Sequence, residues 1–160
     1  MSLKRIKKNM VIISILYCLL MIYLLFLQRY GINNKGSYLE YLNNFTNLKP
    51  FETIVNFVKI LKSNHSYTRE LVQFAFINIG GNLVMFIPLG VFIPIYLRKA
   101  STYCSFIIIV SILIFLIEFI QVITMLGSFD VDDIILNVIG ASIGYIFYKK
   151  TVLRKVKLFN

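Results

Sequence analysis

EFIQVITMLGSFDVDDIILNVIGASIGYIFY, residues 118–148, places acidic side chains inside a stretch that is otherwise typical of membrane spans. It holds four of the seven acidic residues of the chain, namely Glu118, Asp130, Asp132 and Asp133. On a helix, Glu118 and Gln121 share one face. On the following helix, Asp133 and Asn137 share a face in the same way. Any local functional site is therefore expected in this stretch.

Two glycines continue the polar face of the last helix. Gly140 and Gly144 follow Asn137 on the same side of that helix. Glycine lets membrane helices approach one another closely. The stripe therefore predicts that the last helix is packed tightly against its neighbours.

The composition of the chain indicates an integral membrane protein. Of its 160 residues, 58% are hydrophobic and 15% are charged, whereas soluble domains carry about 25% charged residues. The apolar residues come in long blocks that leave no room for a separate soluble domain. The net charge is +10, but the basic residues flank the apolar blocks and form no face with interleaved aromatics. We therefore expect no nucleic-acid partner.

Four apolar blocks are long enough to cross a bilayer as helices. The predicted spans, within one domain covering residues 1–160, are residues 10–28, 71–97, 101–125 and 131–148. Pro88, Gly90 and Pro94 predict a kink in the second span. The sequence therefore predicts an all-α, polytopic membrane protein with four transmembrane helices.

Basic residues predict how this protein is oriented. The N-terminal leader, the Arg98–Lys99 turn and the C-terminal tail are basic and contain no acidic residue. The positive-inside rule places such segments in the cytoplasm. We therefore expect both termini and this turn to be cytoplasmic, and the two other connections to face outward.

The first outer connection contains a predicted short amphipathic helix. Pro50 begins a pattern of apolar residues at helical spacing. These residues are Phe51, Ile54, Val55, Val58 and Leu61. Such a helix lies on the membrane surface or caps the helix bundle, and periodicity does not distinguish lipid from protein as the apolar partner.

Polar residues from three spans are expected at a similar depth. Counted from the outer ends of their spans, they lie about one to three helical turns into the bilayer. They are Asn78, Asn82, Glu118, Gln121 and Asn137. A charged carboxylate at the bilayer centre costs about 2.5–3.5 kcal/mol, so Glu118 faces the bundle interior, is protonated, or both. Together with Asp130 and Asp133 at the outer rim, these residues are predicted to form one outward-facing polar pocket.

Each polar residue also has a purely structural interpretation. Asp130 and Asp133 have the spacing of the N-cap and third residues of a helix, so both would cap the last span. Glu118 and the amides would be hydrogen-bonding links between helices. The aspartates lack the glycine and the final glutamate of a calcium-binding loop. We therefore predict no metal and no cofactor.

Four short segments carry a further pattern. Residues 47–51 read Asn-Leu-x-Pro-Phe, and residues 78–90 contain Asn-x-x-Gly-Asn followed by Phe-x-Pro-x-Gly. Residues 118–121 read Glu-x-x-Gln, and residues 129–133 read Phe-Asp-x-Asp-Asp, with Asn137, Gly140 and Gly144 after them. In this order, the segments resemble the VanZ-like family of small bacterial membrane proteins. One departure is Gly127, where the family often has an arginine; if that arginine pairs with the carboxylates, Arg29 or Arg69 would have to replace it here.

The resemblance implies a role in the bacterial cell envelope. The named member of the family lowers susceptibility to teicoplanin, a glycopeptide antibiotic that carries an acyl chain. The resemblance thus implies a multi-pass plasma-membrane protein that contributes to such antibiotic tolerance, with a membrane lipid or a lipid-linked envelope precursor as its partner. A homo-oligomer is a further option.

Two other functions stay open from sequence. One is a membrane enzyme acting on a lipid head group, with Glu118 as acid or base and the aspartates holding a metal. The other is a small proton-coupled transporter, which with four helices would need a dimer. The chain shows no Ser/Cys–His pair and no phosphate-binding loop, which favours binding over catalysis.

Overall fold

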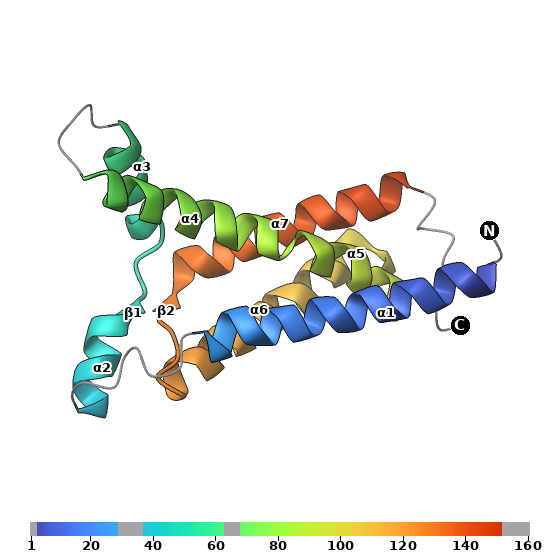
Figure 1. Cartoon of the computed structure of the whole chain (residues 1–160), viewed down its shortest axis with the longest axis horizontal. Helices are drawn as coiled ribbons and strands as arrows, with labels where there is room; N and C mark the ends of the chain where they lie inside the picture. Colours follow the sequence, from blue (N-terminus) through green and yellow to red (C-terminus); the bar gives the residue numbers. More distant parts are fainter. Residues whose placement is uncertain (1–2, 29–36, 63–67, 152–160) are drawn as a thin grey trace.

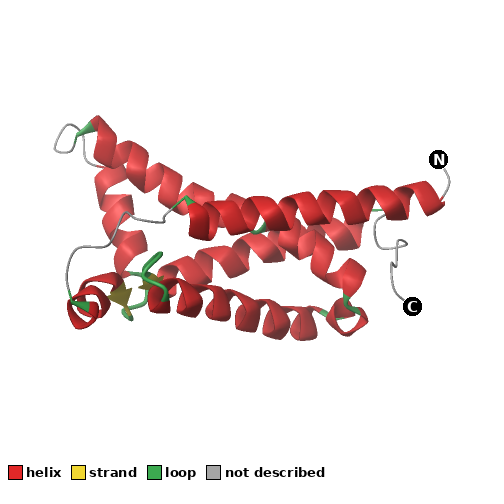
Figure 2. Ribbon diagram, turned by 60° about the horizontal axis from the view of Figure 1, so that its bottom comes forward, coloured by secondary structure: helices red, strands yellow, loops and turns green. Residues whose placement is uncertain are grey.

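The computed structural model describes residues 3–28, 37–62 and 68–151, which are almost entirely helical (Figures 1 and 2). Four helical segments in this part of the chain are long and apolar enough to cross a membrane. They cover Arg5–Leu27, Arg69–Tyr96, Tyr103–Ile123 and Val131–Lys150. The predicted all-α fold with four transmembrane helices is confirmed.

The first two spans are each composed of two helical segments. Helix α1 (Leu3–Ile22) continues into a π-helical turn, η1 (Tyr23–Leu27). Helix α4 (Arg69–Met85) ends at Phe86, and α5 (Ile87–Tyr96) starts after it. Pro88 lies in the first turn of α5, where its missing N–H breaks no helical hydrogen bond. The proline therefore starts a second helix at the predicted kink.

The last two spans are single helices, and a short turn precedes them. The 3-10 turn η2 (Arg98–Ser101) leads into α6 (Tyr103–Ile123), and α7 (Val131–Lys150) completes the bundle. The side chain of Thr102 caps α6 by accepting from the Ser105 N–H. Fully buried Phe106, Val110 and Ile114 of α6 form part of the core.

Helix α7 is the central element, and α1 is the most exposed of the four spans. The most extensive contacts of α7 are with α5 and α4. A Cβ atom on Gly140 would lie 2.0 Å from the Leu83 carbonyl oxygen, and one on Gly144 would lie 1.9 Å from that of Ile87. The backbone of α7 therefore lies directly against the backbones of α4 and α5, an approach that only glycine allows.

The short connecting elements gather at one end of the bundle. The start of α1 and the C-terminal end of α7 lie at the opposite end (Figure 1). The connecting elements are α2 (Tyr38–Phe45), β1 (Thr46–Asn47), α3 (Glu52–Lys62) and β2 (Phe129–Asp130). The strands β1 and β2 pair in parallel, with Thr46 beside Phe129 and Asn47 beside Asp130. We call the β1–β2 pairing the ladder and this end of the bundle the ladder end.

The connection before α4 contains one helix more than the sequence predicted. Helix α2 was not expected; its Tyr41 is buried and its hydroxyl donates to the Gly127 carbonyl. Helix α3 begins two residues after Pro50, because Phe51 has a positive φ of 67°. Helix α3 packs on α4 and α7 and still leaves Val55 exposed.

Candidate functional site

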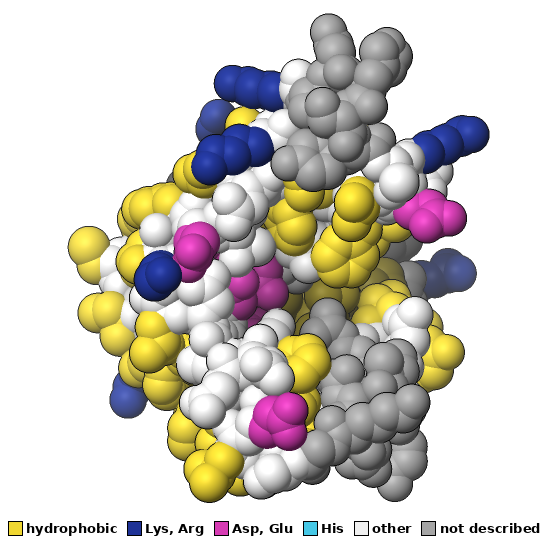
Figure 3. Space-filling model, turned by 90° about the vertical axis from the view of Figure 1, so that its left-hand side faces the viewer, with side chains coloured by type: hydrophobic (Ala, Val, Ile, Leu, Met, Phe, Trp, Pro, Cys, Tyr) yellow, Lys and Arg dark blue, Asp and Glu magenta, His cyan; other side chains and the backbone are white. Residues whose placement is uncertain are grey.

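The ladder joins two segments that lie far apart in the sequence. Pairing of Asn47 with Asp130 places the Asn-Leu-x-Pro-Phe segment against the Phe-Asp-x-Asp-Asp segment. Figure 3 looks onto this end and shows acidic side chains both at its edge and recessed between polar and apolar atoms. Two of the segments that resemble the VanZ-like family therefore meet in space.

Asp130 holds the ladder to the start of α7. Its Oδ1 atom accepts from the backbone N–H of Asp132 at 2.8 Å, so it is the N-cap of α7. Its Oδ2 atom accepts from the hydroxyl of Thr53 at 2.7 Å, and the Asn47 amide lies 3.5 Å from Oδ1. Asp130 therefore caps one helix and binds the first turn of another.

Asp132 is fully buried and holds the N-terminus of α3. Its carboxyl oxygens accept from the backbone N–H groups of Phe51 at 2.5 Å and Ile54 at 3.0 Å. These are among the N–H groups that a helix start leaves without partners, and a carboxylate is favourable there. Sequence reasoning missed this role, although the Asn-Leu-x-Pro-Phe segment was a signal that the first connection has a specific partner.

Neutral groups bind the two buried aspartates. The donors from described residues to Asp130 and Asp132 are backbone N–H groups, a hydroxyl and an amide. Arg69 is exposed at the start of α4, and Arg29 lies outside the described residues. Within the described part of the chain, these neutral donors satisfy oxygens of Asp130 and Asp132 by hydrogen bonding.

Asp133 faces α4, and Glu118 faces α7. The Asn82 amide donates to the carboxyl of Asp133, which joins α4 to α7. The Asn137 amide donates to Glu118 at 3.4 Å, and both side chains are buried. Since Asp133 and Asn137 are one turn apart on α7, the polar groups form a row from α4 across α7 to α6.

Gln121 contacts a different part of the bundle. Its side chain is buried, and its amide donates to the Leu25 carbonyl at 2.9 Å. Leu25 lies in the π-helical turn η1, where the backbone departs from regular α-helical bonding. Gln121 therefore joins α6 to the end of the first span.

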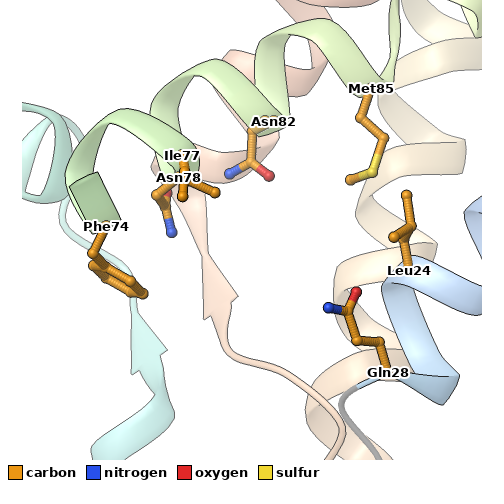
Figure 4. Close-up of a pocket in the computed structure, with 8 residues that line it drawn as sticks. Leu24, Gln28, Phe74, Ile77, Asn78, Asn82 and Met85 are labelled. Carbon is orange, nitrogen blue, oxygen red and sulfur yellow. The ribbon is translucent and has the colours of Figure 1, made fainter. Parts of the chain in front are cut away.

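A cavity of about 440 Å³ lies between the end of the first span and α4 (Figure 4). Its described lining residues are Leu24, Gln28, Phe74, Ile77, Asn78, Gly81, Asn82 and Met85. The side-chain oxygen of Asn78 is buried and has no hydrogen-bond partner. A buried acceptor without a partner is costly, and this oxygen is covered, whereas the Asn78 nitrogen points into the cavity (Figure 4).

The structure distributes the seven predicted pocket residues over several contacts. Asn78 and Asn82 line the cavity, and Asp133 lies behind Asn82. Asn137 and Glu118 continue the polar row, whereas Asp130 binds at the ladder and Gln121 binds the first span. The cavity thus meets the polar row at Asn82 and Asp133.

The described residues contain no group of three or more His, Cys, Asp or Glu side chains placed to hold a metal ion. The oxygens of Asp130 and Asp132 are used by protein donors instead. The contacts of the described polar residues at this site are hydrogen bonds of amides and carboxyl groups.

Comparison with known proteins identifies the family. No curated protein and no solved structure matches the chain. The sequence model of the VanZ/LLP1 family matches residues 14–154, which include most of the first span and all of the other three. The chain therefore belongs to the VanZ/LLP1 family.

Proposed function

We propose that this protein acts in the envelope of a bacterial plasma membrane and contributes to tolerance of teicoplanin-type antibiotics. In this proposal, it handles a lipid or a lipid-linked molecule in the cavity at the ladder end. The observation that carries the proposal is that the cavity combines amide groups with apolar walls inside a membrane span. Membership in the VanZ/LLP1 family supports a role in the envelope.

The buried carboxyl group of Glu118 supports a role beyond helix packing. It is 4% exposed and lies within the third span, five residues before the end of the apolar helix α6. Ionisable side chains at such depth are rare and usually functional. It is hydrogen-bonded to Asn137, one helical turn from Asp133, whose partner Asn82 lines the cavity.

The orientation belongs to the same proposal. At the end opposite the ladder, the described charged residues of the helix ends and the η2 turn are all basic. They are Arg5, Lys7, Lys8, Arg98, Lys99, Lys149 and Lys150. The positive-inside rule places this end in the cytoplasm, so the cavity would open in the outer leaflet.

Cysteine labelling would test this orientation. In a cysteine-free background, single cysteines at Ser37 and Ser128 should react with an impermeant thiol reagent added outside the cell, and one at Ser101 should not. Cys18 and Cys104 are both exposed on the bundle surface, so replacing them should leave the core intact. The reverse labelling pattern would show that the ladder end faces the cytoplasm.

Glu118→Gln would test the function. This change removes the ionisable group but keeps the shape of the side chain, so yield and melting temperature should stay near the parent value. Expression of the parent in a sensitive Gram-positive host should raise the minimal inhibitory concentration of teicoplanin, and the variant should lose that increase. Exposed Glu70 offers a matched control, since Glu70→Gln should retain full tolerance.

Vancomycin serves as the second drug in this experiment. Only teicoplanin inserts an acyl chain into the outer leaflet, so its inhibitory concentration should shift more than that of vancomycin. An equal shift for both drugs would contradict lipid selectivity. Full teicoplanin tolerance from well-folded Glu118→Gln protein would contradict the role of the buried carboxyl group.

A further inference from the structure

A basic pocket lies at the end of the bundle opposite the ladder. It has a volume of about 480 Å³ and is formed by the start of α6 and the end of α7. Its described lining residues are Tyr103, Tyr145, Ile146, Lys149 and Lys150. The pocket therefore combines two lysines with aromatic and aliphatic walls.

Hydrogen bonds and ring contacts hold the walls of this pocket in place. The Tyr145 hydroxyl and Nζ of Lys149 both donate to the Ser101 carbonyl, each at 2.7 Å. Nζ of Lys149 also lies 5.4 Å from the centroid of the Tyr145 ring, and the Tyr103 ring packs against that ring at 5.6 Å between centroids. An ammonium group has three N–H donors, so Lys149 keeps two of them after binding Ser101. A positioned cation with donors left for a ligand therefore borders the pocket.

The acidic side chains of this chain all lie away from the pocket. All seven are between residues 40 and 133. Six of them lie in the connecting elements of the ladder end or in the first turns of α4 and α7, and Glu118 lies five residues before the end of α6. At the pocket end, Lys149 and Lys150 are exposed, as are Arg98 and Lys99 of the η2 turn. The neutralising charge for these lysines must therefore come from outside the chain.

The dipoles of the two helices nearly cancel at the pocket. Tyr103 is the first residue of α6, and a helix N-terminus carries about half a positive charge. Lys149 and Lys150 lie in the last turn of α7, and a helix C-terminus carries about half a negative charge. The two lysine side chains therefore decide the sign of the pocket, which favours an anion.

The pocket lies at the level of the lipid head groups. The fourth span, Val131–Lys150, has 20 residues, so its helix is about 30 Å long and matches the thickness of the hydrocarbon core. Its last residues therefore reach the membrane boundary, where basic residues attract anionic head groups. Ile146 lines the pocket one turn earlier and is 48% exposed, so it offers an apolar surface to an acyl chain.

We infer that this pocket binds the phosphate of an anionic membrane lipid through Lys149 and Lys150. The acyl chain of the lipid leaves the pocket past Ile146. This apolar wall favours a lipid over a free phosphate ester. The inference is independent of the proposed function, because the pocket and the cavity lie at opposite ends of the bundle.

Two phospholipids of different net charge would test this inference. Dimyristoyl phosphatidylglycerol is anionic, whereas dimyristoyl phosphatidylcholine has the same chains and phosphate but is neutral overall. The two lipids would be titrated onto the purified full chain and followed by native mass spectrometry. Phosphatidylglycerol should bind about thirtyfold more tightly, since each lysine near an anionic head group contributes about fivefold. Equal affinities for the two lipids would overturn the inference.

Glycerol 3-phosphate distinguishes a lipid from a free phosphate ester. It carries the phosphate without an acyl chain, so an equal concentration of it should leave phosphatidylglycerol bound. Displacement of the lipid at equal concentration would show that the pocket takes soluble phosphate esters, which would overturn the assignment to a lipid.

Three lysine variants would locate the bound lipid. Lys150→Gln removes an exposed charge, so the protein should fold while its affinity for phosphatidylglycerol falls about fivefold. Lys149→Gln should have a similar effect, because glutamine can still donate to the Ser101 carbonyl. Lys8→Gln is the matched control, since Lys8 is exposed at the same end of the bundle but does not line the pocket. An equal loss of affinity for Lys8→Gln and Lys150→Gln would mean that overall charge attracts the lipid, and the inference would fail.

Discussion

Gly144→Leu should prevent the four spans from assembling into a folded bundle. A Cβ atom at this position would lie 1.9 Å from the Ile87 carbonyl oxygen and 3.1 Å from Cα of Gly90. These obstacles are backbone atoms, which cannot move aside as a flexible side chain would. Overpacking of a core costs about 1–3 kcal/mol when side chains can rearrange, and separation of two backbones should exceed this range. Gly140→Leu should behave in the same way, because its Cβ would meet the Leu83 carbonyl.

Size-exclusion chromatography of a fluorescent fusion, followed by a thermal melt, would measure the effect. Both leucine variants should lose most of the monodisperse peak, and Gly144→Ala should keep a smaller peak with a lower melting temperature. Gly80 is the matched control, since nothing lies within 4 Å of a Cβ built there. Gly80→Ala should match the parent or exceed its melting temperature, because alanine favours helix more than glycine does. Parent-like accumulation and melting of Gly144→Leu would show that this face of α7 is not packed against α5.

Asp132→Ala should release α3 from the bundle while the four spans remain folded. The carboxyl group accepts from the N–H groups of Phe51 and Ile54, and it is fully buried. Hydrogen bonds to charged groups contribute about 1.5–3 kcal/mol each, so loss of both should destabilise the docked helix by about 3 kcal/mol. Asp132→Asn keeps one acceptor oxygen and should have an intermediate effect.

Hydrogen exchange would separate release of α3 from general unfolding. Amides of Glu52–Lys62 should exchange about a hundredfold faster in Asp132→Ala, while those of α6 and α7 keep their protection. The control is Glu40→Ala, which removes an exposed acidic residue from α2. Unchanged exchange of α3 would mean that contacts of α3 with α4, such as the Phe57–Phe74 ring contact, hold it without the carboxyl group.

Some features of this protein were determined by the sequence alone. Long apolar blocks cross lipid as helices, because every backbone polar group must be satisfied within its own segment there. The break of the second span also follows from local chemistry, since Pro88 has no N–H to donate to the preceding turn and lies in the first turn of α5 instead. The capping role of Asp130 is local for the same reason: it depends on spacing within one turn.

Other features were decided only by the tertiary structure. The β1–β2 pairing joins residues separated by two spans, and no local pattern in two-residue strands specifies their partner. Sequence spacing assigned a role to Asp133 and none to Asp132, yet successive residues of a helix point in different directions, and the Asp132 carboxyl binds α3 while that of Asp133 binds Asn82 of α4. The cavity depends on how far α4 lies from the end of the first span. That separation depends on contacts such as the Tyr17–Met85 hydrogen bond between α1 and α4, which exist only once distant helices have packed.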